Sequence, residues 1–135
     1  MNPSFGGRIT VVNNLGLGFD TPPTINISIG HVCGDRVPET VMNNVTIKPW
    51  QASDVVLFIT ERDEDDYWTI HFNCEINGTS ITYDARQIKA TYDFDDDGGV
   101  MIINLCPVTP GSYVMGAEMV FPRSSRFVCR LINFL

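Results

Sequence analysis

Hydrophobic and polar residues alternate with a period of two along most of the chain, the pattern of half-buried β-strands. In Thr24–Val32 every second residue from Ile25 is apolar, and in Tyr67–Ile76 the same holds from Trp68 onwards. The alternation also predicts strands at Arg8–Asn13, Val45–Ile47, Thr79–Tyr83, Gln87–Phe94, Tyr113–Phe121 and Phe127–Ile132. In the last of these, Phe127, Cys129 and Leu131 face away from Val128, Arg130 and Ile132.

Two further segments, Val55–Ile59 and Val100–Ile103, are continuous apolar runs. At this length they predict central strands buried on both faces rather than helices. A period of 3.6 residues is not sustained anywhere, and the best helical fragment is the single turn Pro38–Met42. Turn chemistry separates the apolar runs: Asn77-Gly78 is a strong hairpin signal, and Pro110-Gly111 marks another turn.

These elements predict an all-β fold: one domain over residues 1–135, built as an antiparallel β-sandwich or flattened barrel of about 8–10 short strands. We expect no parallel pairing, because the connections are too short for crossovers. The residues expected to face the core have odd numbers at Ile81 and Tyr83 but even numbers at Ile88 and Ala90. A bulge or bend is therefore expected near Asp84–Arg86. One bent strand would bring the two acidic turns described below to the same end of the sandwich, whereas a hairpin would put them at opposite ends.

The chain is acidic, with 9 Lys and Arg against 16 Asp and Glu and a formal net charge of −7. This balance argues against nucleic-acid binding and against charge-driven adsorption to anionic membranes, since both rest on a cationic surface. No stretch approaches the roughly 20 apolar residues that span a bilayer, so we expect no transmembrane segment.

The sequence leaves localisation open. The N-terminus has no intact signal peptide, which is typical of a cytoplasmic or non-classically secreted protein, and a mature secreted form is the alternative. The sequons at Asn26, Asn44 and Asn77 keep the secreted alternative open. The cysteines, none in a CxxC pair, are interpreted as buried free thiols or as two disulfides: Cys33, Cys74, Cys106 and Cys129.

Two acidic turns carry most of the charge: one runs from Glu61 to Asp66, and the other reads Asp93-Phe94-Asp95-Asp96-Asp97-Gly98. The spacing of Asp93, Asp95 and Asp97 matches the D-x-D-x-D-G pattern that places alternate carboxylates on one calcium ion. It departs from an EF-hand, because the twelfth position is Asn104 and no helix flanks the loop. One hypothesis is that this turn binds calcium, the one candidate cofactor. The alternative is a solvated hairpin tip whose charges discourage pairing with the strand edge of another molecule.

The candidate ligand-binding residues are aromatic and basic. Trp50 follows Lys48-Pro49 in a segment without strand pattern, and Tyr67 opens a strand beside Trp68, which has core parity. Aromatic side chains at loops and strand ends suit sugar stacking or insertion at a lipid interface. Arg126 and Arg130 share a strand face and offer an anion-binding strip, with ion-paired surface as the alternative.

Both histidines have structural explanations that compete with a chemical role. His31 shares the parity of Ile25, Ile27 and Ile29, which predicts a satisfied core or strand-end histidine, although His31-x-Cys33 could supply two metal ligands. His71 lies on a polar strand face, and a general-base role there would need a nucleophile opposite.

The chain resembles, in format, the small β-sandwich proteins of fungi, the aegerolysins and fruiting-body lectins. Ile9-Thr10-Val11-Val12-Asn13-Asn14 is similar to their opening strand ending in Asn, and Ile47-Lys48-Pro49-Trp50 to their isoleucine–proline turn. The tryptophan- and cysteine-rich segment of aegerolysins is missing. The resemblance implies a β-sandwich and transfers no functional residue.

Three functions follow from these features. The first is a non-enzymatic recognition protein that binds a glycan or lipid head group through strand-end loops, in the manner of a lectin or cytolysin. The second is a protein-interaction, effector or inhibitor protein that uses a sheet face or edge. Assembly into a homo-oligomer is an open alternative for its partner. The third is a small hydrolase that uses carboxylates of the acidic turns.

Overall fold

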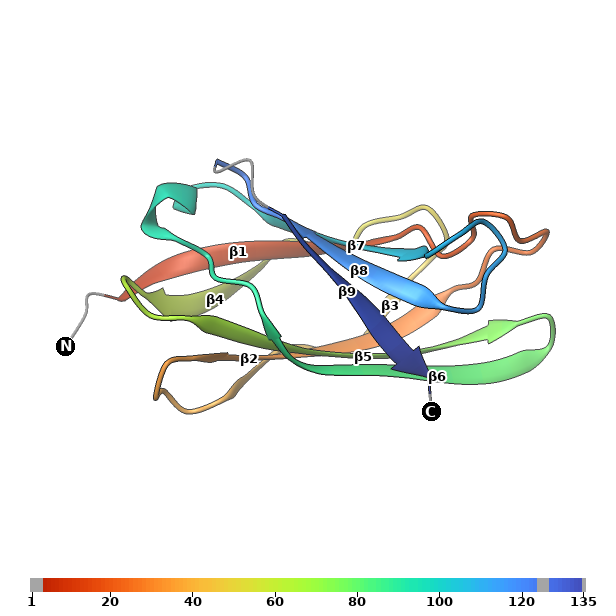
Figure 1. The fold of residues 1–135 in the computed structure, drawn as a ribbon, viewed down its shortest axis with the longest axis horizontal. Helices are drawn as coiled ribbons and strands as arrows, with labels where there is room; N and C mark the ends of the chain where they lie inside the picture. The colour runs from red at the N-terminus through yellow and green to blue at the C-terminus, as the bar shows by residue number, and fades with distance from the viewer. Residues whose placement is uncertain (1–3, 124–126, 135) are drawn as a thin grey trace.

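The computed structural model describes residues 4–123 and 127–134, which form a β-sandwich of two packed sheets (Figure 1). The elements are β1 (Ser4–Asn13), β2 (Ile25–Cys33), β3 (Glu39–Ile47), β4 (Val56–Glu61), β5 (Asp66–Ile76), β6 (Thr79–Lys89), the 3-10 turn η1 (Phe94–Asp96), β7 (Met101–Pro107), β8 (Met115–Val120) and β9 (Phe127–Phe134). Sheet 1 has the order β4-β1-β7-β8-β9, and sheet 2 has the order β3-β2-β5-β6. The predicted all-β sandwich is confirmed.

One strand pair corrects the expectation that parallel pairing is excluded. β1 and β7 run parallel, from Ile9 opposite Met101 to Asn13 opposite Leu105. The crossover between them is not a short loop or a helix, because β2 to β6 all intervene in the chain. The other strand pairs of the described residues are antiparallel, including a short pairing of β6 with β9 that joins the two sheets along one side.

The core lies between the two sheets and follows the predicted alternation. Ile25, Ile27 and Ile29 on β2 are buried, as are the even-numbered residues of β5 from Trp68 to Ile76. On β8 the predicted face is also confirmed, since Met115, Ala117 and Met119 point inward. The rings of Trp68 and Phe58 meet edge to face, with their centroids 4.9 Å apart. Trp68 donates its indole N–H to the carbonyl of Ala90 at 2.8 Å, so this large core residue leaves no polar atom unpaired.

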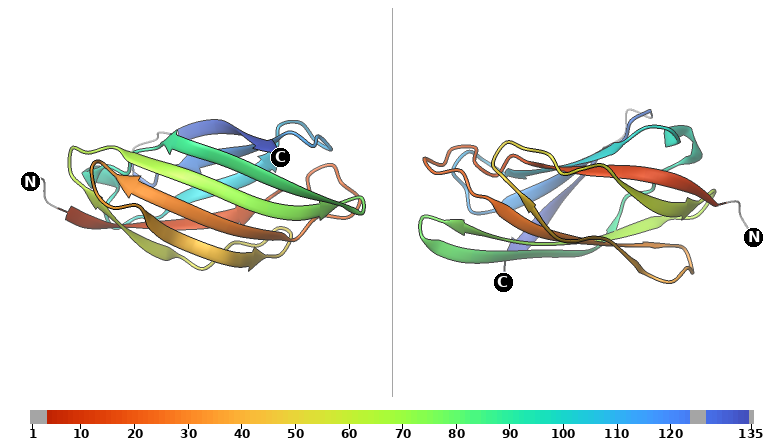
Figure 2. Two further views of the ribbon diagram at one scale, coloured as in Figure 1. Left: turned by 90° about the horizontal axis from the view of Figure 1, so that it is seen from below. Right: turned by 180° about the vertical axis from the view of Figure 1, so that it is seen from behind.

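The two continuous apolar runs are not buried on both faces as predicted. In the first, β4 is the edge strand of sheet 1, with Phe58 buried but Leu57 69% and Ile59 48% exposed. In the second, β7 lies inside the sheet, yet Ile102 on its outer face is 40% exposed. No layer covers the outer face of sheet 1 within the described chain, so these apolar residues face solvent (Figure 2).

The predicted helical turn at Pro38–Met42 is wrong. Residues from Glu39 onwards belong to β3, which pairs with β2 from His31 opposite Glu39 to Ile25 opposite Ile47. Hydrogen bonding to β2 overrides the weak local preference for a turn of helix.

The parity change in β6 is confirmed as a bulge in one bent strand. Trp68 of β5 lies opposite Ile88 and Ile70 lies opposite Ala85, so β6 holds one extra residue between these pairs. Gln87 takes the extra space with a left-handed φ of 55°. Because β6 continues as one strand, it runs back to the end of the sandwich where β5 begins, and both acidic turns lie there (Figure 1).

The sandwich therefore has two chemically different ends. The acidic pole comprises loops 34–38, 62–65, 90–100 and 121–123, and the aromatic pole comprises loops 14–24, 48–55, 77–78 and 108–114 (Figures 1 and 2). Strand direction assigns each loop to its end, since successive antiparallel strands alternate between the two poles.

A fully buried carboxylate closes the sandwich at the acidic pole. Asp66 accepts hydrogen bonds from His31 Nε2 at 2.7 Å, Thr60 Oγ1 at 2.8 Å and the Tyr92 backbone N–H at 2.8 Å. These donors come from β2, β4 and the segment after β6, so one side chain links both sheets. The second ring nitrogen of His31 lies 2.8 Å from Glu39 Oε1. The prediction of a satisfied, buried His31 is thus confirmed.

We predict that Asp66→Asn lowers the free energy of unfolding by about 3 kcal/mol, because an amide NH₂ group would face donors that now meet a buried carboxylate. Asp63→Asn is the matched control: its side chain is exposed and its φ of 65° suits asparagine. Urea unfolding measures both variants. Equal unfolding midpoints for the two would contradict the role given to Asp66.

We also predict that the protein loses stability at alkaline pH. Burial raises the pKa of the Cys74 thiol from 9.0 to about 11. The unfolded chain therefore releases this proton at a lower pH than the folded chain, and the free energy of unfolding falls as pH rises from the unfolded to the folded value, by on the order of 2 kcal/mol. Cys74→Ala removes this titration, so its stability should fall less steeply in urea unfolding over the same pH range. Identical slopes would contradict the raised pKa.

Candidate functional site

The aromatic pole gathers exposed apolar side chains on its loops. Trp50 is 51% and Tyr113 40% exposed, and four aliphatic side chains are exposed to a similar degree: Leu17, Val55, Val108 and Val114. The charged residues of these loops are few, namely Asp20, Lys48 and Asp54. A large apolar surface on loops marks an interaction site more often than a scattered exposed residue does.

Asn13, at the end of β1, fixes two of these loops to the sandwich. Its fully buried side-chain amide donates to the carbonyls of Pro23 and Ile47 at 2.9 and 3.0 Å, and its side-chain oxygen accepts from the Leu15 N–H. Its backbone carbonyl accepts from the Trp50 N–H at 2.8 Å. Asn13 therefore joins the ends of β1 and β3 to the start of β2. The sequence shows Asn13 at the end of a predicted strand but does not reveal that its side chain joins these loop ends.

Trp50 is held in an unusual backbone conformation. Its φ is 64°, in the left-handed region that costs a non-glycine residue about 1 kcal/mol or more. Its ring rests against Gly16, where an added Cβ would lie 3.0 Å from Trp50 Cζ2 and 2.5 Å from Pro22 Cβ. The rest of the indole faces solvent. The surrounding backbone thus supports a strained residue that presents half of a large aromatic ring outward.

Tyr113 is anchored between three other segments of the same pole. Its hydroxyl accepts a hydrogen bond from Asn77 Nδ2 at 2.7 Å, and its ring lies 5.8 Å from that of Phe19. Its backbone carbonyl accepts from Tyr83 Oη at 2.8 Å. These contacts hold the ring at the surface in a defined place.

Two glycines let the neighbouring loops of the aromatic pole approach closely. The Gly111 N–H donates to the Leu17 carbonyl at 2.9 Å, and both Gly18 and Gly111 have φ near 80°. A Cβ on Gly18 would lie 2.2 Å from the Gly111 nitrogen, so only glycine fits there. The loops of this pole are thus locked to one another rather than independent.

The three predicted ligand-binding residues that the structure describes do not form one site. Trp50 lies at the aromatic pole, whereas Tyr67 begins β5 at the acidic end of sheet 2. Arg130 is exposed on β9 between the poles, and Arg126 lies outside the described residues. Of the described three, Trp50 is the one that lies at the pole whose loops carry the exposed aromatic and aliphatic side chains.

The second acidic turn is organised by a buried aspartate outside the calcium spacing. Asp96 is fully buried, and its carboxylate accepts hydrogen bonds from the Asp93 and Arg123 N–H groups at 3.0 and 3.3 Å. Asp93 and Asp96 form a reciprocal capping box around η1. Among the described residues, no three His, Cys, Asp or Glu side chains lie together in a way that could hold a metal ion. Asp93, Asp95 and Asp97 therefore do not converge, and the geometry gives the calcium hypothesis no support.

Beside this turn lies a shallow polar hollow of about 270 Å³, lined by Arg62, Asp63, Asp93, Phe94 and Asp95. The Arg62 guanidinium lies 4.8 Å from the centre of the Phe94 ring and covers its face. The aromatic surface is thus occupied by an intramolecular cation–π contact rather than open to a ligand.

The buried group around His31 contains residue types found in catalytic triads, but its geometry is structural. Cys33 Sγ lies 3.4 Å from Thr60 Oγ1, which donates to Asp66, and a cavity of about 60 Å³ lies beside the ring. The ring nitrogens of His31 contact the carboxylates of Asp66 and Glu39 rather than Thr60 or Cys33, so the ring is not placed to activate either group. Burial raises the pKa of Cys33 and keeps its thiol protonated.

All four cysteines are free thiols. Cys33 and Cys74 are buried as predicted, but Cys106 is half-buried and Cys129 is exposed, because both point to the outer face of sheet 1. His71 is paired with Asp84 at 3.3 Å on the outer face of sheet 2.

No protein-family model matches the chain, and no curated protein matches its sequence. The resemblance to fungal β-sandwich proteins therefore stays a prediction. Among the described residues, the structure has no helix with the length and apolar character to cross a membrane.

We predict that calcium does not specifically stabilise the protein. An ion that binds the folded state alone raises its stability by about 2.7 kcal/mol at 100 times the dissociation constant, which a melting curve detects readily. Because the carboxylates do not converge, the melting temperature in millimolar CaCl₂ should match that in MgCl₂ at equal ionic strength. A calcium-specific increase that Asp95→Asn abolishes would restore the metal site.

Proposed function

We propose that the protein is a non-enzymatic recognition module that binds a glycan or a lipid head group through its aromatic pole. The observation that carries this proposal is the exposed, backbone-strained Trp50 on a loop that Asn13 holds to the sandwich. Strain at an exposed aromatic residue is a poor choice for stability alone, and such strain clusters at functional sites. A preorganised aromatic ring also binds at a lower entropic cost.

The chemistry of the pole suits ligands with both apolar and hydroxyl surfaces. The exposed face of Trp50 can stack on the apolar face of a sugar ring or enter the interfacial region of a bilayer, where tryptophan and tyrosine side chains are favoured. Tyr113 offers a second ring at the same pole, and the exposed aliphatic side chains of its loops add apolar surface.

The distribution of charge favours a neutral ligand. Most of the acidic residues lie at the acidic pole or along the strands, and the net charge of −7 opposes approach to anionic surfaces. We therefore propose uncharged glycans or zwitterionic head groups rather than anionic lipids.

The other two functional hypotheses fare differently. The hydrolase hypothesis needs two free carboxylates that flank a cleft, and Glu61 is instead paired with Arg36 at 2.9 Å. A protein-interaction role has a specific observation in its favour, the exposed apolar residues on the outer face of sheet 1.

We predict that Trp50→Ala weakens binding by about tenfold or more, because tryptophans at the centre of a binding surface often contribute 2 kcal/mol or more. Val37→Ala is the matched control, since Val37 is 87% exposed at the acidic pole. Binding is measured on an array of neutral glycans and by co-sedimentation with phosphatidylcholine vesicles that contain or lack sterol. Trp50 emission should shift to shorter wavelength on binding, whereas the buried Trp68 contributes a constant background.

The two assays separate the two ligand classes. Glycan binding without vesicle binding identifies a lectin-like module, and the reverse identifies a lipid-binding one. Folded wild-type protein that binds neither, or binding that Trp50→Ala and Val37→Ala reduce equally, would contradict the proposal.

A further inference from the structure

The outer faces of the two sheets differ in character. On sheet 2 the outward residues of β5 after Tyr67 are polar: Thr69, His71, Asn73 and Glu75. On sheet 1 the exposed outward residues include Leu57 and Ile59 of β4, Ile102 of β7 and Leu131 of β9, at 40–69% exposure. A monomer gains nothing from so many apolar side chains in water, and apolar patches of this kind mark interfaces.

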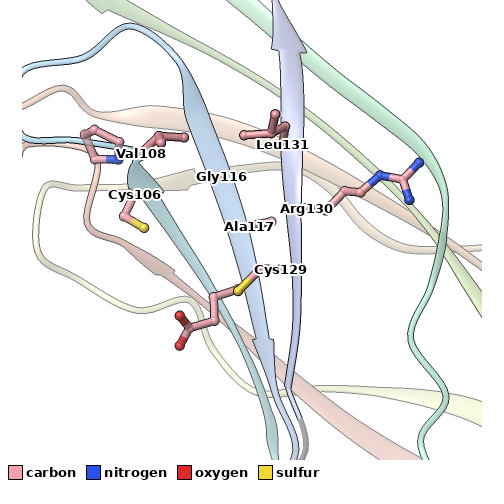
Figure 3. A pocket seen from close by; sticks show the side chains of 9 residues that line it. Cys106, Val108, Gly116, Ala117, Cys129, Arg130 and Leu131 are labelled. Atoms are coloured by element: carbon pink, nitrogen blue, oxygen red, sulfur yellow. The ribbon is translucent and has the colours of Figure 1, made fainter.

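The sheet 1 face is hollowed at one end. A groove of about 280 Å³ crosses β7, β8 and β9, with Cys106, Val108, Cys129 and Leu131 around the bare backbone of Gly116 (Figure 3). Arg130 points to the other side of β9, as expected from the burial of Ile132 two residues later (Figure 3). The missing side chain at position 116 thus creates a recess, with Glu118 also on its rim, in a face where exposed apolar residues alternate with polar ones such as Thr10 and Asn104.

The sheet 1 face is also nearly uncharged, in contrast with the whole molecule. Among described strand residues with outward parity, the charged ones are Arg8, Glu118 and, at the end of β4, Glu61. Glu61 is neutralised by Arg36 at 2.9 Å, and Arg8 and Glu118 have opposite signs. Two copies of a chain with net charge −7 could therefore meet on this face while their acidic poles remain in solvent.

We propose that the outer face of sheet 1 is the contact surface of a homodimer in which two such faces pack against each other. Sheets pack face to face about 10 Å apart through interdigitating side chains, and the exposed Leu57, Ile59, Ile102 and Leu131 supply apolar ones on this face. Its five strands, at about 4.8 Å spacing and about six residues of roughly 3.4 Å each, give a face of roughly 500 Å². Two faces would bury on the order of 1,000 Å², the size at which specific interfaces begin.

Pairing through the open edge of β4 is a weaker alternative for the same dimer. The Ile59 N–H is engaged by Glu39 Oε1 at 3.3 Å, so β3 partly covers this edge. A carboxylate beside the edge disfavours a second strand there. The flat face is therefore the surface that a second copy fits. This inference does not depend on the ligand of the aromatic pole, which lies at one end of the sheets.

Sedimentation velocity over a concentration series tests the dimer. Wild-type protein should shift from the mass of one chain to that of two, whereas Leu57→Lys and Leu131→Lys should stay monomeric. Asn73→Lys is the matched control, because it adds the same charge to an exposed strand position on sheet 2 and should leave the dimer intact. Gly116→Val fills the groove where an added Cβ meets neighbours at an ordinary 3.6 Å, so it should fold and weaken the dimer at least severalfold.

Cys129 supplies an independent readout on the unmodified chain. It is exposed in one copy but would lie within the dimer interface, so its reaction with a thiol reagent should slow severalfold as concentration rises. Leu57→Lys should abolish this concentration dependence. Wild-type protein that remains monomeric at near-millimolar concentration, or a dimer that Asn73→Lys disrupts as strongly as Leu57→Lys, would overturn the proposal. A monomer whose Leu57→Lys variant loses vesicle binding would assign the face to lipid instead.

Discussion

The buried amide of Asn13 is the interaction on which the aromatic pole depends. It supplies two donors and one acceptor to backbone groups of segments that meet after β1, after β3 and before β2. Without this side chain, the carbonyls of Pro23 and Ile47 would be left unpaired in an apolar interior, which is costly. The backbone carbonyl of Asn13 separately accepts from the Trp50 N–H, so one residue holds both the buried loop ends and the loop that carries the exposed tryptophan.

At each pole one buried polar side chain binds groups from several segments, but the side chain is a neutral amide at one pole and a carboxylate at the other. At the aromatic pole a neutral amide pairs with backbone groups, and at the acidic pole the carboxylate of Asp66 gathers donors from three segments. Asn13 lies at the last residue of β1 and Asp66 at the first residue of β5, where backbone groups no longer have hydrogen-bond partners in a neighbouring strand. The neutral Asn13 side chain allows the loops of the aromatic pole to be apolar, whereas the acidic pole carries charged and solvated loops.

Much of the fold could be predicted from period-two alternation, because β2 and β5 of sheet 2 each have one buried apolar face and one more polar face. The parity change between Tyr83 and Ile88 predicted a bulge or bend, but it left open whether the two acidic turns share an end, which the single strand β6 decides. The prediction that the apolar runs Val55–Ile59 and Val100–Ile103 are buried on both faces was wrong, because a strand with an exposed apolar face has the same sequence pattern as a doubly buried strand.

The candidate site was less accessible to sequence reasoning. Trp50 could be singled out because it follows Lys48-Pro49 outside any strand pattern, but its neighbours come from loops distant in the chain. The roles of Asn13, Asp66 and Asp96 depend on burial, which a single polar letter does not reveal. Tyr67 and Arg130 failed as partners of Trp50 because strand direction and position along the strand determine where on the sandwich each residue lies.

The parallel pairing of β1 with β7 has a consequence for biosynthesis. β4 can join β1 once the first half of the chain has left the ribosome, but the opposite edge of β1 stays open until residues 101–105 emerge. Contacts between such distant segments form slowly, and an open strand edge invites association with other nascent chains. We therefore expect this polypeptide to require protection during translation, at a strand whose two edges are both paired in the finished protein.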